Sequence, residues 1–271
     1  MTPVKLVCED AIGVLTLSRA EMHNALVPEQ LEAVSAALAE VGANQGLKAL
    51  VVAAEGPAFS IGGDMRRFQA ELEAGNLPAY AARIVGALND VVVAMTALPQ
   101  PIIAAVHGTV TGGSLGFVVG ADLVVLAEDA VLKSHYATAG FCPDGGWTAV
   151  LPSLIGQRRA SEALLLNRSI SAAKALDWGL ANELAPADEV LPRAMDLARK
   201  IARYPQGTMR QSKRLLAMKR EDLAQRLEAE RQGFIQLIAG AEAQTGLKAF
   251  LQQFTSYPGG GGQTAAAPRP L

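Results

Sequence analysis

The sequence predicts an α/β fold with a helical segment at its carboxyl end. Strand-like and helical apolar patterns alternate over residues 1–187, whereas helical patterns alone continue from about Asp188 to Tyr257. Half of the 271 residues are hydrophobic, which is enough for a large core. The predicted parts are therefore a core over 1–187 and a helical segment over 188–257. We expect residues 258–271 to form a disordered tail, because Gly, Pro and Ala predominate there and few side chains can pack.

The predicted elements of the core follow one another as strand, helix and strand. The runs "IGVLTL" (Ile12–Leu17) and "KALVVAA" (Lys48–Ala54) are typical of buried strands. Between them lies an amphipathic helix that begins near Pro28 and places four apolar residues on one face, namely Leu31, Val34, Leu38 and Val41. The order repeats with a helical run from Leu77 to Leu98, the strand "PIIAAVHG", a glycine-rich turn, the short helix "SLGFVVGA" and the strand "DLVVLAE".

The charge balance and the amino terminus argue against several classes of protein. A formal net charge of -2 and a pI near 6.0 leave no basic surface for nucleic acid or an anionic membrane. The start "MTPVKLVCED" lacks an export signal, and no uninterrupted apolar stretch reaches the length that spans a bilayer. Cys8 and Cys142 form no disulfide framework, and no His, Asp or Glu spacing predicts a metal site. We expect a cytoplasmic protein with no metal, nucleic-acid partner or membrane partner.

Two glycine-rich turns follow predicted strands. They are "FSIGGDM" (Phe59–Met65) and "GTVTGGSLG" (Gly108–Gly116). Glycines leave backbone N–H groups unshielded, and the second turn lies where a helix begins, which favours an anion. For a single Gly-Gly pair, tight packing of strand against helix is the better interpretation, but two such turns can form one oxyanion site. Neither turn has the spacing of a P-loop or a dinucleotide-binding fingerprint.

Five motifs, in order, resemble those of the enoyl-CoA hydratase/isomerase (crotonase) family. They are "LSRAEMHNALV", "AFSIGGDM", "LPQPIIAAVHGTVTGGSLGFVVGADLVVLAEDAVL", "GFCPDGGWTAVLPSLIGQRRASEALLLNRSISAAKALDWGLANEL" and "GLKAFL". The resemblance implies a spiral of β-β-α turns and assembly into a homotrimer or hexamer through the helical segment. It also implies an acyl-CoA substrate, with coenzyme A as part of the thioester and no permanently bound cofactor.

The same resemblance implies roles for individual residues. The backbone N–H groups of Gly63 and Gly113 would donate to the thioester oxygen. The coenzyme path would be lined by Ala25, Leu26, Ser60, Ile61 and Asp64. The "GLKAFLQQF" segment has Gln253 and Phe254 where the family often has Lys-Arg. Arg66, Arg67 and Lys248 are therefore candidates for the coenzyme phosphates.

The chain departs from the family at the acid and base positions. Hydratases use two glutamates, whose positions fall here on Gly116 and Tyr136. Hydration needs one group to activate water and a way to protonate the α-carbon, so ordinary syn-hydration of a 2-enoyl thioester is not expected.

Asp144, in "GFCPDGGW", is the carboxylate that remains. Pro-Asp-Gly alone is typical of a surface turn. However, its position resembles the aspartate of isomerases that act on ring-derived acyl-CoA thioesters, and also the aspartate nucleophile of a dehalogenase branch. One carboxylate can carry a proton from one carbon to another. Burial near four side chains, Tyr136, Phe141, Cys142 and Trp147, would raise its pKa. The preferred catalytic set is thus Asp144 with Gly63 and Gly113.

The predicted substrate pocket contains five residues, His135, Tyr136, Gly116, Phe141 and Trp147. Tyr136 can hydrogen-bond Asp144, or form only pocket wall together with His135. The preferred function is double-bond isomerisation with Asp144 as proton shuttle. The alternatives are a dehalogenase or hydrolase with Asp144 as nucleophile, a hydratase of atypical mechanism, and a non-catalytic acyl-CoA-binding relative. Apolar stripes after Asp188, among them Leu215, Leu223, Leu227, Phe234 and Leu237, also favour assembly.

Overall fold

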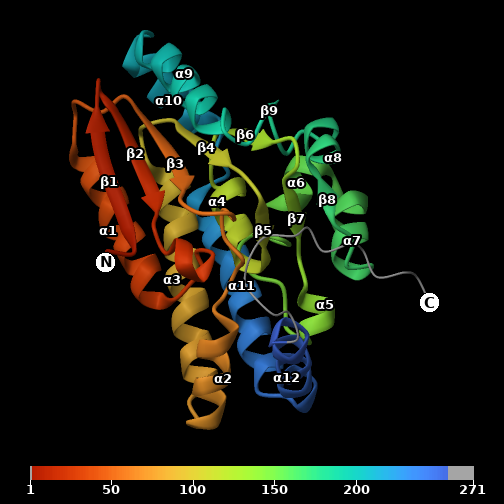
Figure 1. Ribbon diagram of the computed structural model, residues 1–271. Helices are drawn as coiled ribbons and strands as arrows, with labels where there is room; N and C mark the ends of the chain where they lie inside the picture. Colours follow the sequence, from red (N-terminus) through yellow and green to blue (C-terminus); the bar gives the residue numbers. More distant parts are fainter. Residues whose placement is uncertain (1, 256–271) are drawn as a thin grey trace.

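A six-stranded sheet forms the centre of the protein, whose computed structural model describes residues 2–255 (Figure 1). Its strands, in spatial order, are β1 (Val4–Glu9), β2 (Ile12–Leu17), β3 (Ala49–Ala54), β4 (Ile102–Val106), β6 (Leu123–Ala127) and β9 (Glu183–Ala185). Neighbouring strands are parallel from β2 onward, and β1 pairs antiparallel with β2 at the edge. The sequence analysis missed β1, because its residues lie largely exposed and show no buried run.

A second, three-stranded sheet contains β5 (Thr109–Thr111), β7 (Val131–Lys133) and β8 (Ile170–Ser171). The chain passes from β4 in the large sheet to β5 in the small one and then into a helix, and it repeats this step with β6 and β7. This succession confirms the predicted β-β-α fold. Each strand of the small sheet has only two or three residues, which is too few for an alternating apolar pattern to be recognised in the sequence.

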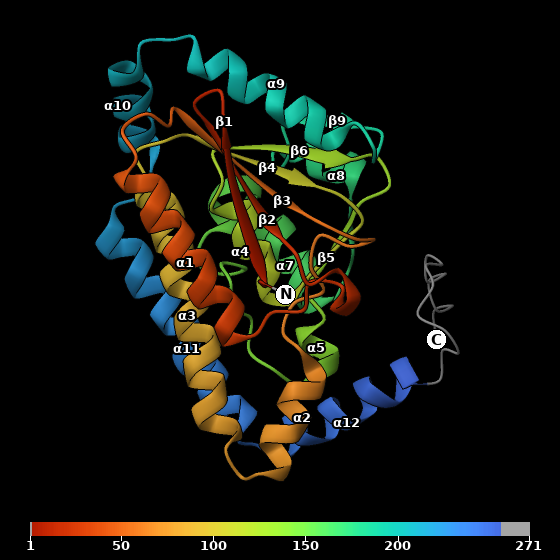
Figure 2. The same cartoon turned by 60° about the vertical axis from the view of Figure 1, so that its left-hand side comes forward.

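Helices cover the sheets on several sides. The longer ones are α1 (Pro28–Ala43), α2 (Met65–Glu73), α3 (Leu77–Ala97), α7 (Gln157–Leu165), α9 (Val190–Ala202), α10 (Gln206–Leu216), α11 (Arg220–Ile238) and α12 (Ala241–Thr255). The shorter ones are η1 (Ala20–Met22), η2 (Gly112–Ser114), α4 (Leu115–Val119), α5 (Tyr136–Ala139), α6 (Leu151–Ile155) and α8 (Ala172–Asp177). Figure 2 shows α1, α3 and α11 side by side and α9 across the large sheet.

Among the described residues, helix α3 is the one helix that is long and apolar enough, by length and composition alone, to cross a membrane. Arg83 and Asp90 interrupt its apolar residues, so it does not contradict the expectation that no uninterrupted apolar stretch reaches spanning length. Half of that apolar window is buried inside the protein, where α3 packs between α1 and α11. Such burial is typical of a core helix.

The helices after Asp188 complete the core. Helix α9 packs on β3, β4 and β6, and α11 lies along α3. Leu223, Leu227 and Phe234 are buried within the chain, so they do not offer the assembly surface expected from their spacing. Leu215 and Leu237 are exposed. Trimeric or hexameric assembly stays a prediction, and the predicted tail lies outside the described residues.

Candidate active site

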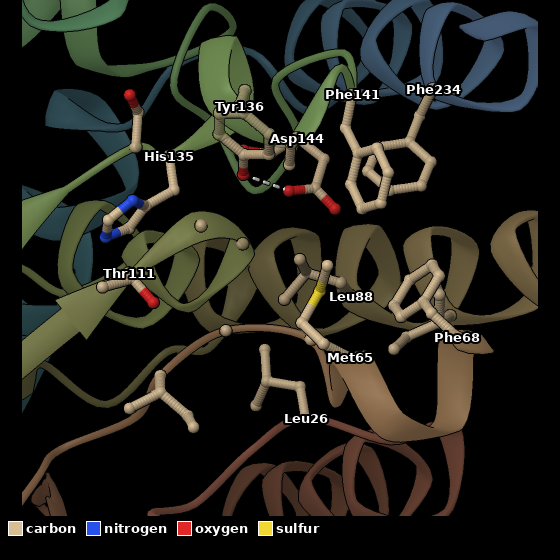
Figure 3. A pocket seen from close by; sticks show the side chains of 18 of the residues that line it. Leu26, Met65, Phe68, Leu88, Thr111, His135, Tyr136, Phe141, Asp144 and Phe234 are labelled. Atoms are coloured by element: carbon tan, nitrogen blue, oxygen red, sulfur yellow. Dashed lines mark hydrogen bonds between the residues drawn. The ribbon is translucent and has the colours of Figure 1, made fainter. Parts of the chain in front are cut away.

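One pocket gathers the two glycine turns, Asp144 and side chains from the carboxyl-terminal helices (Figure 3). The empty space between its walls, together with the open solvent at its mouth, is about 630 Å³. Phe234 of α11 and Phe250 of α12 line it. The site therefore draws on the helical segment over 188–257 as well as on the core over 1–187, to which the predicted catalytic and pocket residues all belong.

The two glycine turns lie directly against each other. Thr111 N donates to the Ser60 carbonyl at 3.1 Å, and the Ser114 hydroxyl donates to the same oxygen at 3.0 Å. Gly62 has φ +77°, and a Cβ there would lie 2.6 Å from the Thr111 carbonyl oxygen. Gly113 is the second residue of η2, where a backbone N–H has no acceptor within the helix. Gly63 and Gly113 thus border one pocket, as an oxyanion hole requires, and their role as donors stays a prediction.

The loop that carries Asp144 packs on the second glycine turn. Gly145 has φ +62°, and a Cβ there would lie 2.4 Å from the Gly113 carbonyl oxygen, so only glycine fits. A Cβ on Gly113 would in turn lie 2.9 Å from Asp144 Oδ1. Asp144 is 7% exposed and lines the pocket. The surface-turn interpretation is therefore wrong, and the carboxylate lies beside the candidate oxyanion donor.

The environment of Asp144 favours a base that titrates near neutral pH. Burial raises the pKa of Asp144 to about 7, the hydrogen bond from Tyr136 opposes this rise, and the nearby charge of Glu230 adds to it. The Tyr136 hydroxyl donates to Asp144 Oδ1 (Figure 3). Burial and the Asp144 charge raise the pKa of Tyr136 well above its usual range. Tyr136 thus stays a neutral donor that orients the carboxylate.

Two predicted pocket residues do not line the pocket. His135, Tyr136 and Phe141 do line it. Trp147 is fully buried behind the glycine turn, where its Nε1 donates to the Gly112 carbonyl at 2.8 Å. Gly116 of α4 is buried, and a Cβ there would lie 2.8 Å from Val92 Cγ2.

Of the predicted coenzyme-binding residues, likewise, only some line the pocket. Leu26 and Ile61 line the pocket, whereas the side chains of Ala25, Ser60 and Asp64 do not. The Ser60 hydroxyl donates to the Asn24 carbonyl at 2.7 Å. Asp64 caps α2 by accepting hydrogen bonds from two backbone N–H groups. These two side chains hold the fold in place rather than facing the pocket.

The candidates for the coenzyme phosphates remain predictions. Arg66 and Lys248 are exposed. Arg67 Nε donates to Glu71 at 2.9 Å. The side chains of Gln253 and Phe254 lie outside the described residues.

Three phenyl rings close the inner end of the pocket. The ring centroids of Phe68, Phe141 and Phe234 lie 5.4 to 6.1 Å from one another, and all three side chains are buried. Ile61, also in the lining, is 40% exposed and marks the open end. The sequence analysis missed Phe68 as a pocket residue and assigned Phe234 to an assembly stripe. The three phenyl rings therefore lie together at one end of the pocket, and His135 and Thr111 lie at the other (Figure 3).

Asp144 is the only carboxylate among the described residues that line this pocket. The described residues also contain no group of three or more His, Cys, Asp or Glu side chains placed to hold a metal ion. His135 lines the pocket near Thr111, whereas Asp144 lies toward Phe141 and Phe234 (Figure 3). Burial lowers the pKa of His135 to about 4, so its ring is neutral at neutral pH.

Known proteins share this sequence pattern and this architecture. The 1,2-epoxyphenylacetyl-CoA isomerase of Escherichia coli is 28% identical over 248 residues, which cover 90% of this chain and 93% of that protein. The structure of Pseudomonas aeruginosa OdaA has a TM-score of 0.81 at 26% identity, over 93% of this chain and 99% of that one. An enoyl-CoA hydratase from Bacillus halodurans, at 21% identity and a TM-score of 0.85 over 91% and 99% of the two chains, shows the same fold. The sequence profile described as enoyl-CoA hydratase/isomerase matches residues 8–257, and the chain therefore belongs to this family of enzymes that act on acyl-CoA thioesters.

Proposed function

We propose that this protein is an enoyl-CoA double-bond isomerase in which Asp144 carries one proton between two carbons of the substrate. The observation that supports this most is a single buried carboxylate, with a pKa raised to about 7, beside a glycine turn suited to an oxyanion. The E. coli relative named as an isomerase is consistent with the proposal.

The proposed reaction needs one base and one oxyanion site. With a 3-enoyl thioester, the Asp144 carboxylate takes a proton from C2, and the C–H electron pair forms a dienolate whose charge rests on the thioester oxygen. The N–H groups of Gly63 and Gly113 stabilise that oxygen. Asp144, now protonated, returns the proton to C4, which leaves a 2-enoyl thioester and the original carboxylate. Tyr136 keeps Asp144 in one orientation through both transfers.

Hydration is disfavoured by the same geometry. It requires a second group that activates water, and none of the other described lining residues is a carboxylate. Gly116, where hydratases carry a glutamate, has no room for a side chain because Val92 lies 2.8 Å from the Cβ position. Tyr136 occupies the position of the second hydratase glutamate, and its hydroxyl donates a hydrogen bond to Asp144.

The proposal is tested by the products formed from three substrates. We expect the protein to convert 3-enoyl-CoA into 2-enoyl-CoA of the same mass. We expect no gain of water with crotonyl-CoA and no loss of halide with 4-halobenzoyl-CoA. Halide release would instead support Asp144 as a nucleophile, and hydration would show a second acid or base. Binding of all three thioesters without turnover would indicate a non-catalytic acyl-CoA-binding protein.

The aromatic wall predicts a preference for compact acyl groups. Phe234→Ala should open the closed end and raise kcat/KM for a C8 3-enoyl-CoA relative to the C4 substrate by about 10-fold or more, since apolar contacts of a few methylenes are worth that much. Phe117→Leu is the matched control, because Phe117 is buried against Phe59 and does not line the pocket. An equal ratio of kcat/KM for the C8 and C4 substrates in the two variants would contradict the placement of Phe234 at the end of the acyl pocket.

A further inference from the structure

A second buried carboxylate lies behind the loop that carries Asp144. Glu230 of α11 is 3% exposed and does not line the pocket. Its Oε2 accepts a hydrogen bond from Gly146 N at 2.9 Å. Its Oε1 accepts from Thr148 N at 2.7 Å, from the Thr148 hydroxyl at 2.7 Å and from Ala149 N at 2.9 Å. All four donors belong to the turn that follows Asp144.

These hydrogen bonds explain how a buried charge is tolerated in this part of the protein. A buried carboxylate is costly unless donors satisfy it, and hydrogen bonds to a charged group are stronger than neutral ones. The donors that act on Glu230 are backbone N–H groups and one hydroxyl, with no cation among the groups described around it. Removing Glu230 would leave three buried or partly buried N–H groups without their acceptor.

The same helix contacts the loop on the other side of Asp144. A Cβ on Gly233 would lie 2.7 Å from Cys142 Sγ, so α11 and the loop approach closely there. Phe234 packs against Phe141 at a centroid distance of 5.4 Å. One face of α11 thus holds the loop both before and after Asp144.

We propose that Glu230 is a positioning residue: by binding the turn at Gly146–Ala149 it holds the Asp144 carboxylate against Gly113. The inference rests on the proposed role of Asp144 as proton carrier. Glu230 does not contact the pocket, so it does not replace the acid that hydratases use.

Besides positioning the loop, Glu230 affects the pKa of Asp144 through its charge. Asp144 faces Tyr136 of α5 and Gly113 of η2, and Glu230 of α11 lies behind its loop. Two further titratable groups, Cys142 and His135, lie nearby. The Glu230 charge raises the pKa of Asp144, and the Tyr136 hydrogen bond lowers it. Removing the charge should therefore lower this pKa and make Asp144 a weaker base.

The test compares Glu230→Gln with Thr148→Val. Glutamine retains one acceptor oxygen but removes the charge and places an N–H₂ group near a donor. Thr148→Val also removes one hydrogen bond to Glu230 but leaves its charge. We expect Glu230→Gln to lower kcat by about 10- to 100-fold, with KM within about 3-fold, since small misplacements of a catalytic group have effects of that size. Thr148→Val should stay within about 3-fold of the unmodified protein.

The titration of Asp144 gives a readout independent of turnover. The ¹³Cγ signal of Asp144 can be assigned by its loss in Asp144→Asn and followed from pH 5 to 9. Its midpoint should fall by about 0.5–1 pH unit in Glu230→Gln, as expected for one nearby charge, and stay in place in Thr148→Val. An unchanged midpoint in Glu230→Gln would overturn the inference, whether or not the protein proves to be an isomerase.

A measurement on the unmodified protein covers the case in which Glu230→Gln does not fold. Hydrogen exchange of the peptide that contains Gly146, Thr148 and Ala149 should be slow, because their N–H groups donate to a buried carboxylate. Exchange at the rate of an exposed loop would contradict the proposed contact.

Discussion

Replacing Asp144 with asparagine should lower the turnover of a 3-enoyl-CoA by about 10²–10⁴-fold, which is the usual contribution of a positioned acid or base. The amide retains the shape and can still accept the Tyr136 hydrogen bond, but it cannot take a proton. Binding of the acyl-CoA should therefore change only a few fold, as isothermal titration can measure. Asp90→Asn, on the exposed side of α3, is the matched control and should retain normal activity. Turnover near the normal rate in Asp144→Asn would remove the proton-carrier role.

The raised pKa gives the same variant a second expected effect, on stability. Asp144 titrates at about 7 in the folded protein and near 3.8 when unfolded, so the unfolded state loses its proton first as pH rises. Stability is therefore lost between about pH 4 and pH 7 and remains lower above that range. Asp144→Asn should escape this loss and raise the free energy of unfolding at pH 8 by up to about 4 kcal/mol. Denaturant unfolding at pH 5 and pH 8 should show the gain mainly at the higher pH.

Gly113→Ala should have the second large effect, because the new Cβ has no free space. It would lie 2.9 Å from Asp144 Oδ1 and 2.7 Å from Leu88 Cδ2. The leucine end is flexible, but the carboxylate is held by Tyr136 and the Gly145 contact. Alanine keeps the backbone N–H, but relief of these contacts would move that N–H and the Asp144 carboxylate out of position. We expect kcat to fall by about 10²–10³-fold, a loss as large as that caused by removing one oxyanion donor.

Two further variants show which contact causes the expected loss of activity in Gly113→Ala. Gly207→Ala should be neutral, since no atom lies within 4 Å of its Cβ position. In Gly113→Ala/Leu88→Ala the leucine contact is relieved while the Asp144 contact remains, so activity should stay low. Recovery in that double variant would assign the loss to the Leu88 contact instead of the Asp144 contact. Activity of Gly113→Ala within about 3-fold of normal would contradict the proposed role of the turn.

Much of the large sheet could be predicted from the sequence because its strands are buried. β3 and β4 are continuous apolar runs, which a parallel strand covered on both faces requires. β1 could not be predicted, since only its edge pairing with β2 makes it a strand. The short strands of the small sheet form through pairing between distant residues, such as Val110 with Leu132, and have no local pattern.

The candidate site could be predicted in part for similar reasons. The glycine turns and Asp144 belong to short sequence motifs and could be identified from them. Glu230 belongs to no such motif. Its position between Leu227 and Phe234 on the apolar stripe of α11 was nevertheless an indication, because a charged residue there needs a buried hydrogen-bonding partner. Sequence alone could not show whether that stripe covered this chain or another copy. The path of α11 along α3 decides it.

The most direct test of the central claim is deuterium uptake by an unsaturated thioester in D₂O. If Asp144 alone carries the proton, the protonated aspartate will sometimes exchange with solvent before it returns the proton. The unmodified protein should then place deuterium at C2 or C4 of the enoyl-CoA, detected as a gain of one mass unit per site, and should not add D₂O to crotonyl-CoA. Asp144→Asn should show neither. Efficient addition of water to crotonyl-CoA by the unmodified protein would contradict a mechanism that uses a single base.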